Sequence, residues 1–398
     1  MRPTLGIVPY FVSACLSRGA DAGAIVGIVL LANRVSPHTA AAGLLAACLT
    51  APHLAGPIAA RILDRTRRKQ LLLAAAFLLY AASIAGAALL LEHHTFLAAA
   101  ALTVLAGLCG PLLTGGLSSV LGALVADNEL SQRRAQGMDA FTYGVAATCG
   151  PALIAIVAAA FGPTQAVFAA AALAAGGGLV ALALPTGVGS VVGTTEPIPT
   201  VRSTIGVLLR TGTLRRVAVG TALSALPVGA VSLLAIAFAL DHHGSAVQGA
   251  ILVTVDGVGS LIGSTVAIVW PLRGNPDRLI RWWTLAVAAG FGLCALSPTA
   301  PIAAVAFGAT GAATSLQFAA NLAARAAFSP PAARAQIFVT MAGLKTAFSS
   351  VGVALVGLAT GLGSTELLVA AVVAVLLGLL YMLVDGARSA RVSPSQSR

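Results

Sequence analysis

Charged residues are the scarcest class in this sequence. Only 9% of its 398 residues are Asp, Glu, Lys or Arg, whereas a soluble globular domain carries about 25%. The mean hydropathy is +0.95, and no single compact core of this length hides that much apolar surface. The composition therefore excludes a water-soluble globular protein and indicates that lipid is the main solvent of the chain.

Enzyme motifs are missing as well. The sequence has no G-x-x-x-x-G-K-[ST] loop, which argues against ATP-driven transport by this chain. It also has no H-E-x-x-H, no G-x-S-x-G and no acidic metal cluster. We therefore expect no enzymatic activity, no catalytic residue and no cofactor. A polytopic membrane enzyme is the less favoured alternative.

Potential metal ligands are few and poorly spaced. The five cysteines lie in apolar stretches without a C-x-x-C pair, so they indicate packing rather than a zinc site or a disulfide framework. The pairs His93-His94 and His242-His243 lie in expected outer loops. Adjacent histidines without further ligand spacing are a weak metal signal, and we assign no metal site.

Long apolar runs dominate what is present. A membrane-spanning helix needs about 20 mostly apolar residues, and backbone groups inside lipid must be paired within the segment. The alternating pattern of β-barrel strands does not occur. The sequence therefore predicts an all-α integral membrane protein with twelve transmembrane helices. They are expected near residues 6–31, 39–60, 70–91, 96–125, 136–160, 164–184, 216–240, 246–270, 279–298, 301–324, 335–361 and 366–384.

The basic residues predict the orientation of the chain. A net charge of +11 on its own suggests nucleic acid. With the N-terminus inside, however, 20 of the 23 Lys and Arg fall on the inner side, only Arg34 falls outside, and Arg18 and Lys345 lie within spans. This distribution accounts for the charge loop by loop and excludes a nucleic-acid partner. We expect a multi-pass protein of the inner (plasma) membrane with cytoplasmic N- and C-termini.

The two halves of the chain repeat each other. Arg134-Ala135-Gln136 opens the fifth span and Arg334-Ala335-Gln336 opens the eleventh. Gly150-Pro151-Ala152-Leu153 likewise corresponds to Gly352-Val353-Ala354-Leu355. A stretch rich in Gly, Pro, Thr and Ser between spans six and seven indicates a linker. We expect two six-helix pseudo-repeats, with one bundle over residues 1–184, a cytoplasmic linker over 185–215, a second bundle over 216–386 and a cytoplasmic tail over 387–398.

A basic segment follows the second span, with the sequence Ala60-Arg61-Ile62-Leu63-Asp64-Arg65-Thr66-Arg67-Arg68-Lys69. It resembles the loop motif G-x-L-a-D-R-x-G-R-K of the major facilitator superfamily, although Ala60 and Arg67 replace both glycines. The resemblance implies a twelve-helix secondary transporter with a gating loop that contains Asp64, Arg65, Arg68 and Lys69. In that role the acid pairs with charges and a helix end of the opposite half. The simpler alternative is a loop that only sets the topology.

Gly150-Pro151 in the fifth span resembles the start of the antiporter motif G-P-x-x-G-G found in drug:proton antiporters of that family. Ile154 and Ala155 replace the last two glycines, and a Gly-Pro pair also simply kinks a helix. The family normally carries an Arg in the fourth span, whereas residues 96–125 here hold no charge. The resemblance implies export, but this departure leaves the family's proton relay without its usual Arg.

Ionisable residues inside spans are the main candidates for coupling or substrate binding, because a charge at mid-bilayer costs at least about 2.5 kcal/mol. Arg18 and Asp21 lie three residues apart on one face of the first span. They form either a functional pair or an inert ion pair, and the uncharged equivalent segment of the seventh span favours function. His53 in the second span titrates near neutral pH, but a packing role suits it equally.

Two further charges lie near the midplane of the second half. Asp256 and Lys345 are each about ten residues, or about 15 Å, from opposite faces. An unpaired charge there is expensive, so we expect the two to pair or to face each other across a cavity. Asp139 lies early in the fifth span, where we expect it to cap the helix or to pair with Arg133 or Arg134.

Together these features predict a secondary active transporter that moves a small hydrophobic or amphipathic molecule by alternating access, coupled to protons. Gly150-Pro151 and a cavity with few charges favour export. An uptake permease of the same fold is the alternative. The expected partners are the small-molecule substrate, the proton and the lipid bilayer, and the expected state is a monomer.

Overall fold

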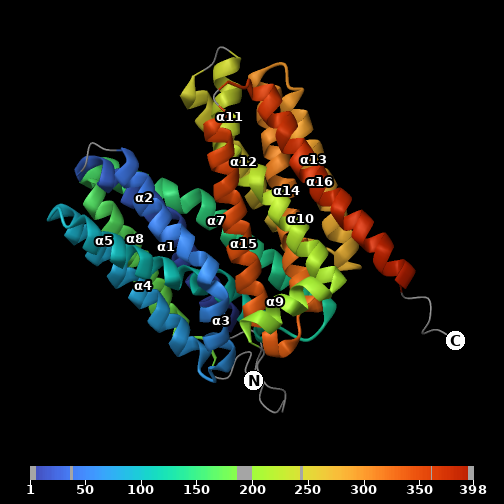
Figure 1. Ribbon diagram of the computed structural model, residues 1–398, viewed down its shortest axis with the longest axis horizontal. Coiled ribbons are helices and arrows are strands. Elements are labelled where there is room, and N and C mark those ends of the chain that lie inside the picture. The colour runs from blue at the N-terminus through green and yellow to red at the C-terminus, as the bar shows by residue number, and fades with distance from the viewer. Residues whose placement is uncertain (1–5, 36–38, 186–199, 243–244, 360, 393–398) are drawn as a thin grey trace. The chain divides into compact units, whose positions relative to one another are not determined.

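The computed structural model describes residues 6–35, 39–185, 200–242, 245–359 and 361–392, and every regular element in them is a helix (Figure 1). The first eight are α1 (Ile7–Val35), α2 (Thr39–Thr50), α3 (Gly56–Arg65), α4 (Lys69–Glu92), α5 (Phe96–Pro111), α6 (Leu117–Leu121), α7 (Glu129–Phe161) and α8 (Pro163–Ala181). The others are α9 (Val201–Arg210), α10 (Gly212–Gly229), α11 (Val231–Asp241), α12 (Ala246–Val269), α13 (Pro276–Ala295), α14 (Ala300–Phe328), α15 (Arg334–Leu358) and α16 (Ser364–Val392).

The predicted twelve-helix membrane fold is confirmed. Within the described residues, ten helical segments are long and apolar enough to cross a membrane, and α10 with α11 forms an eleventh span that is bent by 42°. The remaining predicted span, 279–298, corresponds to α13, with 20 residues. Large aliphatic side chains point outward from these helices, as expected for a chain solvated by lipid; Val305 on α14, for example, is 74% exposed.

The chain divides into two compact units. The N-terminal unit consists of residues 1–131, 142–201 and 330–343, and the C-terminal unit of residues 132–141, 202–329 and 344–398. Residues 132–141 of α7 therefore belong to the C-terminal unit, and the first turns of α15 belong to the N-terminal unit. These are the two helices that open with the repeated Arg-Ala-Gln. Residues 186–199 of the predicted linker lie outside the described residues, and α9 occupies part of the remainder.

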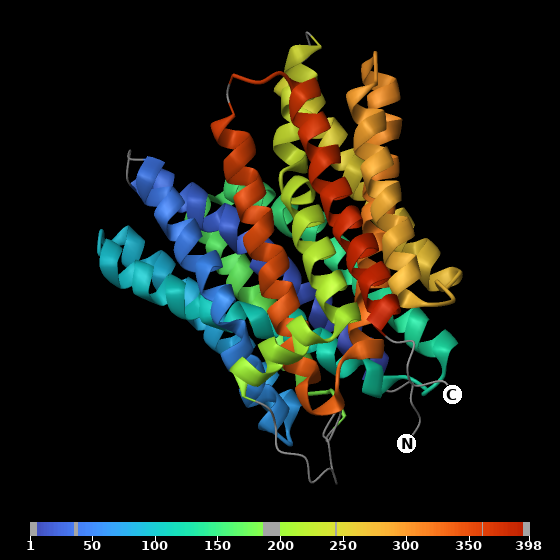
Figure 2. The ribbon, with the colours of Figure 1, turned by 45° about the vertical axis from the view of Figure 1, so that its right-hand side comes forward.

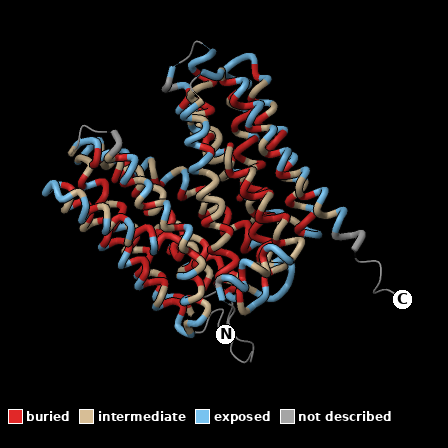
Figure 3. The backbone as a smooth tube through the Cα atoms, viewed as in Figure 1, coloured by how far each residue is buried: buried red, intermediate tan, exposed pale blue. Residues whose placement is uncertain are grey.

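Each unit packs as a helix bundle. In the N-terminal unit α1 and α4 pack against α8, and α5 packs against α4 and α2. In the C-terminal unit α13 packs between α14 and α16, while α12 packs against α14, as both ribbon views show (Figure 1, Figure 2). Buried residues follow the inner sides of the helices (Figure 3). The α12–α14 contact is very close because Gly259 and Gly263 of α12 lie directly against the backbone of Gly308 and Ala312.

Prolines interrupt three of the spans. Pro52 lies in a 3₁₀ turn, Ala51–Ala55, between α2 and α3. Pro111 precedes a π-helical turn, Leu112–Gly116, and Pro227 lies in the last turn of α10 just before the bend to α11. Proline has no N–H and clashes with the preceding turn, so a helix that contains it loses a regular hydrogen bond. Such irregular turns inside membrane spans are common at functional sites.

Candidate functional site

An acid, an imidazole and a phenol meet inside the N-terminal unit. The Asp21 carboxylate on α1 accepts a hydrogen bond from the Tyr80 hydroxyl on α4, with an Oη–Oδ1 distance of 3.2 Å. Its other oxygen, Oδ2, lies 3.6 Å from Nε2 of His53. Tyr80 and His53 are buried, and the side chain of Asp21 keeps 17% of its surface exposed. The three residues form a nearly sealed ionisable cluster, hereafter the Asp21 cluster.

The local sequence explains how His53 reaches Asp21. The 3₁₀ turn around Pro52 redirects the chain between α2 and α3, and His53 is the middle residue of that turn. Gly110 on α5 leaves room for the imidazole, because a Cβ atom on Gly110 would overlap the His53 ring. A packing histidine was the alternative expectation, but here the ring is directed at a carboxylate.

Arg18 has a different set of partners, although it lies one turn from Asp21 on α1. Its Nη2 donates to Ser118 Oγ at 2.8 Å and to the Thr114 carbonyl at 3.2 Å. Its Nη1 donates to Thr142 Oγ1, and its guanidinium carbon lies 3.8 Å from the centre of the Tyr143 ring. The π-helical turn after Pro111 contains Thr114 and therefore supplies one of these acceptors. No ion pair joins Arg18 to Asp21, both of which the structure describes.

The predicted gating loop contacts the start of α15 within the N-terminal unit. Asp64 Oδ1 accepts from the Ala335 N–H at 3.2 Å, and Oδ2 accepts from the Gln336 N–H at 3.1 Å. A carboxylate at this position satisfies two otherwise unpaired amides and interacts favourably with the positive end of the helix dipole. Lys69 is buried next to Asp64, whereas Arg65 and Arg68 are exposed.

Gly150 has a packing role beside this site. It lies against α1, where a Cβ atom on Gly150 would approach the Gly19 carbonyl oxygen to 2.6 Å. The helix α7 continues through Pro151 to Phe161. The Gly150-Pro151 pair therefore lets α7 approach α1 closely, next to the turn that carries Arg18 and Asp21.

A family model described as Major Facilitator Superfamily matches residues 10–216, which is more than half of the chain. The chain belongs to the major facilitator superfamily. No curated protein matches it. Members of this superfamily are transporters rather than enzymes, so the fold is that of a membrane transporter.

Solved structures of the superfamily resemble the chain over nearly its whole length. The human organic anion transporter MFSD10 (TETRAN) is 13% identical, with a TM-score of 0.76 over 96% of this chain and 100% of that one. A bacterial homologue of the iron transporter ferroportin is 12% identical, with a TM-score of 0.77 over 97% and 100%. The proton:xylose symporter XylE is 15% identical, with a TM-score of 0.72 over 95% of each chain. At these identities the likeness shows the fold alone.

Asp256 and Lys345 do not pair. Lys345 Nζ lies 4.1 Å from the centre of the Phe318 ring on α14, a cation–π contact. Asp256 on α12 lies instead against Gly311, where a Cβ atom would come within 3.1 Å of Asp256 Oδ1. No ion pair joins these two described residues, so the structure does not bring the predicted partners together.

A buried polar ladder on α14 escaped the sequence analysis. Gln317 Nε2 donates to Ser224 and Thr284 hydroxyls at 3.1 and 2.8 Å, and Asn321 Nδ2 donates to the Thr221 hydroxyl. Arg325 Nε donates to Asn321 Oδ1 at 2.6 Å. The predicted span 301–324 leaves Arg325 in a loop on the inner side, but α14 runs to Phe328 and buries it to 1% exposure. The spacing of four residues between the three polar side chains was the available signal.

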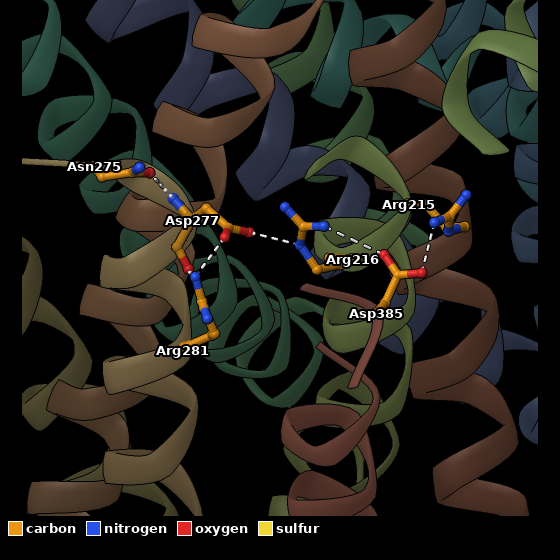
Figure 4. A network of polar contacts seen from close by, with 6 residues as sticks. All are labelled: Arg215, Arg216, Asn275, Asp277, Arg281 and Asp385. Atoms are coloured by element: carbon orange, nitrogen blue, oxygen red, sulfur yellow. Dashed lines mark hydrogen bonds and ion pairs between the residues drawn. The ribbon is translucent and has the colours of Figure 1, made fainter. Parts of the chain in front are cut away.

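Three arginines and two aspartates form a network at one end of the C-terminal unit (Figure 4). Arg216 is central, because its Nε lies 3.0 Å from Asp277 Oδ1 and its Nη1 lies 3.3 Å from Asp385 Oδ2. Arg215 reaches Asp385 at 2.5 Å, and Arg281 reaches Asp277 at 2.6 Å. The network ties together the starts of α10 and α13 and the last turns of α16. These arginines, predicted only as topology signals, also hold helices together.

The histidine pairs gain no support as a metal site. Among the described residues, no group of three or more His, Cys, Asp or Glu side chains is placed to hold a metal ion. His243 lies outside the described residues, and the His242 ring stacks on Phe238. Asp139 is buried, with 1% of its surface exposed, and lies ten residues beyond the start of α7, where Asn128 is the N-cap, so it does not cap this helix. Its pairing with Arg133 or Arg134 stays a prediction.

Proposed function

We propose that this transporter is a proton-coupled exporter of a small hydrophobic or amphipathic molecule. The observation that carries the proposal is the Asp21 cluster: a carboxylate, an imidazole and a phenol in contact inside a membrane-spanning bundle. Ionisable groups at such depth are expensive to retain and usually mark ion or substrate pathways. Histidine is the side chain whose ordinary charge change lies nearest neutral pH, and a carboxylate in contact with it supplies a partner for the protonated ring.

Coupling requires that the proton affinity of the cluster differ between two conformations of the transporter. The cluster is suited to this, because its three groups come from three separate elements: α1, the 3₁₀ turn after α2, and α4. A small movement of α1 relative to α4 or the turn separates Asp21 from its partners. Arg18 lies on the same helix as Asp21. A movement of α1 therefore also changes the hydrogen bonds of Arg18 to Thr114, Ser118 and Thr142.

The Asp64 contact is the proposed gate. Two backbone amides of the first turn of α15 are held by one carboxylate, and this contact is made in one conformation and broken in the other. The bond is replaceable by water at a helix end, so breaking it costs about 1 kcal/mol rather than the larger free energy of exposing a buried charge. Such a modest contact suits a step that must be reversed in every transport cycle.

The remaining assignments follow the same proposal. The functional state is a monomer in the plasma membrane, with both termini cytoplasmic and the proton as coupling ion. Residues 1–184 and 216–386 act as the two six-helix bundles, joined by 185–215, and residues 387–398 form the cytoplasmic tail. The distribution of Lys and Arg supports this orientation.

Direction is tested in proteoliposomes of known orientation. The reconstituted full chain is assayed with ethidium, tetraphenylphosphonium and a panel of neutral amphipathic dyes, with and without an imposed pH gradient. Export coupled to protons predicts movement of a transported dye against the direction of proton flow. Movement of every transported compound together with protons identifies an uptake permease and overturns the proposal of export.

A further inference from the structure

A cavity of about 510 Å³ lies at one end of the C-terminal unit, where α11 ends and α12 and α14 begin. The arginine network lies at the other end of the same bundle, since α10 and α13 start there. Most of the lining is apolar, with one wall made by side chains of α11, α12, α14 and the loop that precedes α14. This wall contains Phe238, Ala239, Ile251, Leu252, Pro298 and Ala304.

The polar part of the lining carries negative charge. Among the lining residues that the structure describes, Asp241 is the one carboxylate and none is a Lys or Arg. The Ser364 N–H donates to Asp241 Oδ2 at 2.5 Å, which fixes the carboxylate at the rim of the cavity. Glu366 binds the neighbouring Gly363 N–H and adds a second negative charge just outside the lining.

His242 contributes a further hydrogen-bond acceptor. Its Nδ1 lies 2.9 Å from the Phe238 carbonyl oxygen. A carbonyl oxygen only accepts, so Nδ1 carries the hydrogen and the neutral ring presents Nε2 as an acceptor. The ring is held in place by stacking on Phe238, with 4.0 Å between the ring centres. A ligand at this end meets a carboxylate and an imidazole acceptor beside an apolar wall.

We propose that this cavity is a second ligand site, separate from the Asp21 cluster, and that it binds an amphipathic amine. The protonated amine donates to Asp241, and His242 Nε2 accepts a further N–H. The apolar body of the ligand lies against Phe238, Ile251 and Leu252. The volume is in the range of small-molecule sites, which bury an apolar body and orient it with a few polar groups. The site goes beyond the proposed function because it requires no proton coupling and no transport.

The test compares three probes of one shape and different charge. The probes are 4-phenylbutylamine, 4-phenylbutanol and 4-phenylbutyrate. Their binding to the full chain in nanodiscs is measured by saturation-transfer NMR and calorimetry, without any gradient. The amine is expected to bind most tightly and the acid least. Asp241→Asn is expected to weaken amine binding about tenfold, as for loss of a charged hydrogen-bond partner, and to leave the alcohol within about twofold. Asn retains an oxygen that accepts the Ser364 N–H, so this variant keeps the turn.

Glu366→Gln is the matched control, because it removes the same charge from the same end of the bundle outside the lining. It is expected to leave amine binding within about twofold. Ala304→Phe fills the cavity without changing charge and is expected to abolish binding of both amine and alcohol. Any one of three results would overturn the proposal. These are equal binding of the three probes, equal effects of Asp241→Asn and Glu366→Gln, and full binding by Ala304→Phe. Failure of export in proteoliposomes leaves these binding results unaffected.

Discussion

Neutralising Asp277 should destabilise the C-terminal unit more than removing Arg281, the more exposed of its two arginine partners. Asp277 is 6% exposed and serves two arginines, of which Arg216 is buried and Arg281 keeps 29% of its side chain in contact with solvent. Asp277→Asn leaves Arg216 with Asp385 as its remaining acidic partner in the network. Removing one partner of a buried ion pair costs about 3–5 kcal/mol, and we expect the low end because Asp385 remains.

Two smaller terms refine that magnitude. Asp277 lies in the first turn of α13, where a carboxylate gains about 0.3–1 kcal/mol from the helix dipole, and the substitution removes this too. Arg281 can turn toward solvent, so its pair contributes only about 0–1 kcal/mol. The Asn275 cap is untouched, since it accepts from the backbone N–H of Asp277. The expected total for Asp277→Asn is therefore about 3.3–5 kcal/mol.

The change in the free energy of unfolding is measured by unfolding the purified full chain with SDS in mixed micelles. Circular dichroism and tryptophan fluorescence follow the transition. Arg281→Ala should cost about 1 kcal/mol or less. The exposed Asp127→Asn, which removes the same charge elsewhere, should stay within about 0.5 kcal/mol of the unmodified chain. If Arg281→Ala destabilises as much as Asp277→Asn, the ordering derived from burial is wrong.

Three further substitutions test the N-terminal unit by transport and expression in proteoliposomes and membranes. Tyr80→Phe removes the hydroxyl that donates to Asp21 and should lower gradient-driven transport about tenfold, with counterflow retained; unchanged driven transport would remove Tyr80 from the cluster. Gly110→Val should displace the His53 ring and abolish driven transport, whereas Gly43→Val, where a Cβ meets nothing within 4 Å, should not. Asp64→Asn keeps one acceptor oxygen but replaces the other with a nitrogen that only donates, so it should destabilise the α15 contact by about 1 kcal/mol. We expect a changed transport rate without loss of inserted protein. A rate equal to that of the unmodified chain would mean that the loop only sets the topology.

The spans were predictable because a membrane imposes one strong rule on sequence. Each must be a helix of about 20 apolar residues, so the expected run 70–91 corresponds to Lys69–Glu92, and 246–270 to Ala246–Val269. The ends of long helices were less predictable. The predicted span 301–324 ended just before Arg325, yet Asn321 and the Phe318 ring provide contacts that let α14 continue past it.

The site was predictable in its members but not in its contacts. Asp21 and His53 stood out because ionisable residues are rare in spans, but their contact depends on the 3₁₀ turn and on the space at Gly110, neither of which has a distinctive sequence pattern. Tyr80 escaped because a tyrosine inside a span is unremarkable until its hydroxyl faces a carboxylate. Depth alone suggested that Asp256 pairs with Lys345, but depth does not determine which face of a helix a charge occupies.

The most direct test of the central claim is proton coupling through Asp21. Asp21→Asn and the exposed control Asp127→Asn are reconstituted in parallel with the unmodified chain, using a dye from the panel that the unmodified chain transports. Counterflow is measured without a gradient, and accumulation is measured under an imposed pH gradient between about pH 5 and 8. The account predicts that Asp21→Asn inserts, folds and exchanges the dye but no longer accumulates it, while Asp127→Asn does both. Accumulation by Asp21→Asn equal to that of the unmodified chain at every pH in this range would contradict the account and return the search for the coupling group to Asp256.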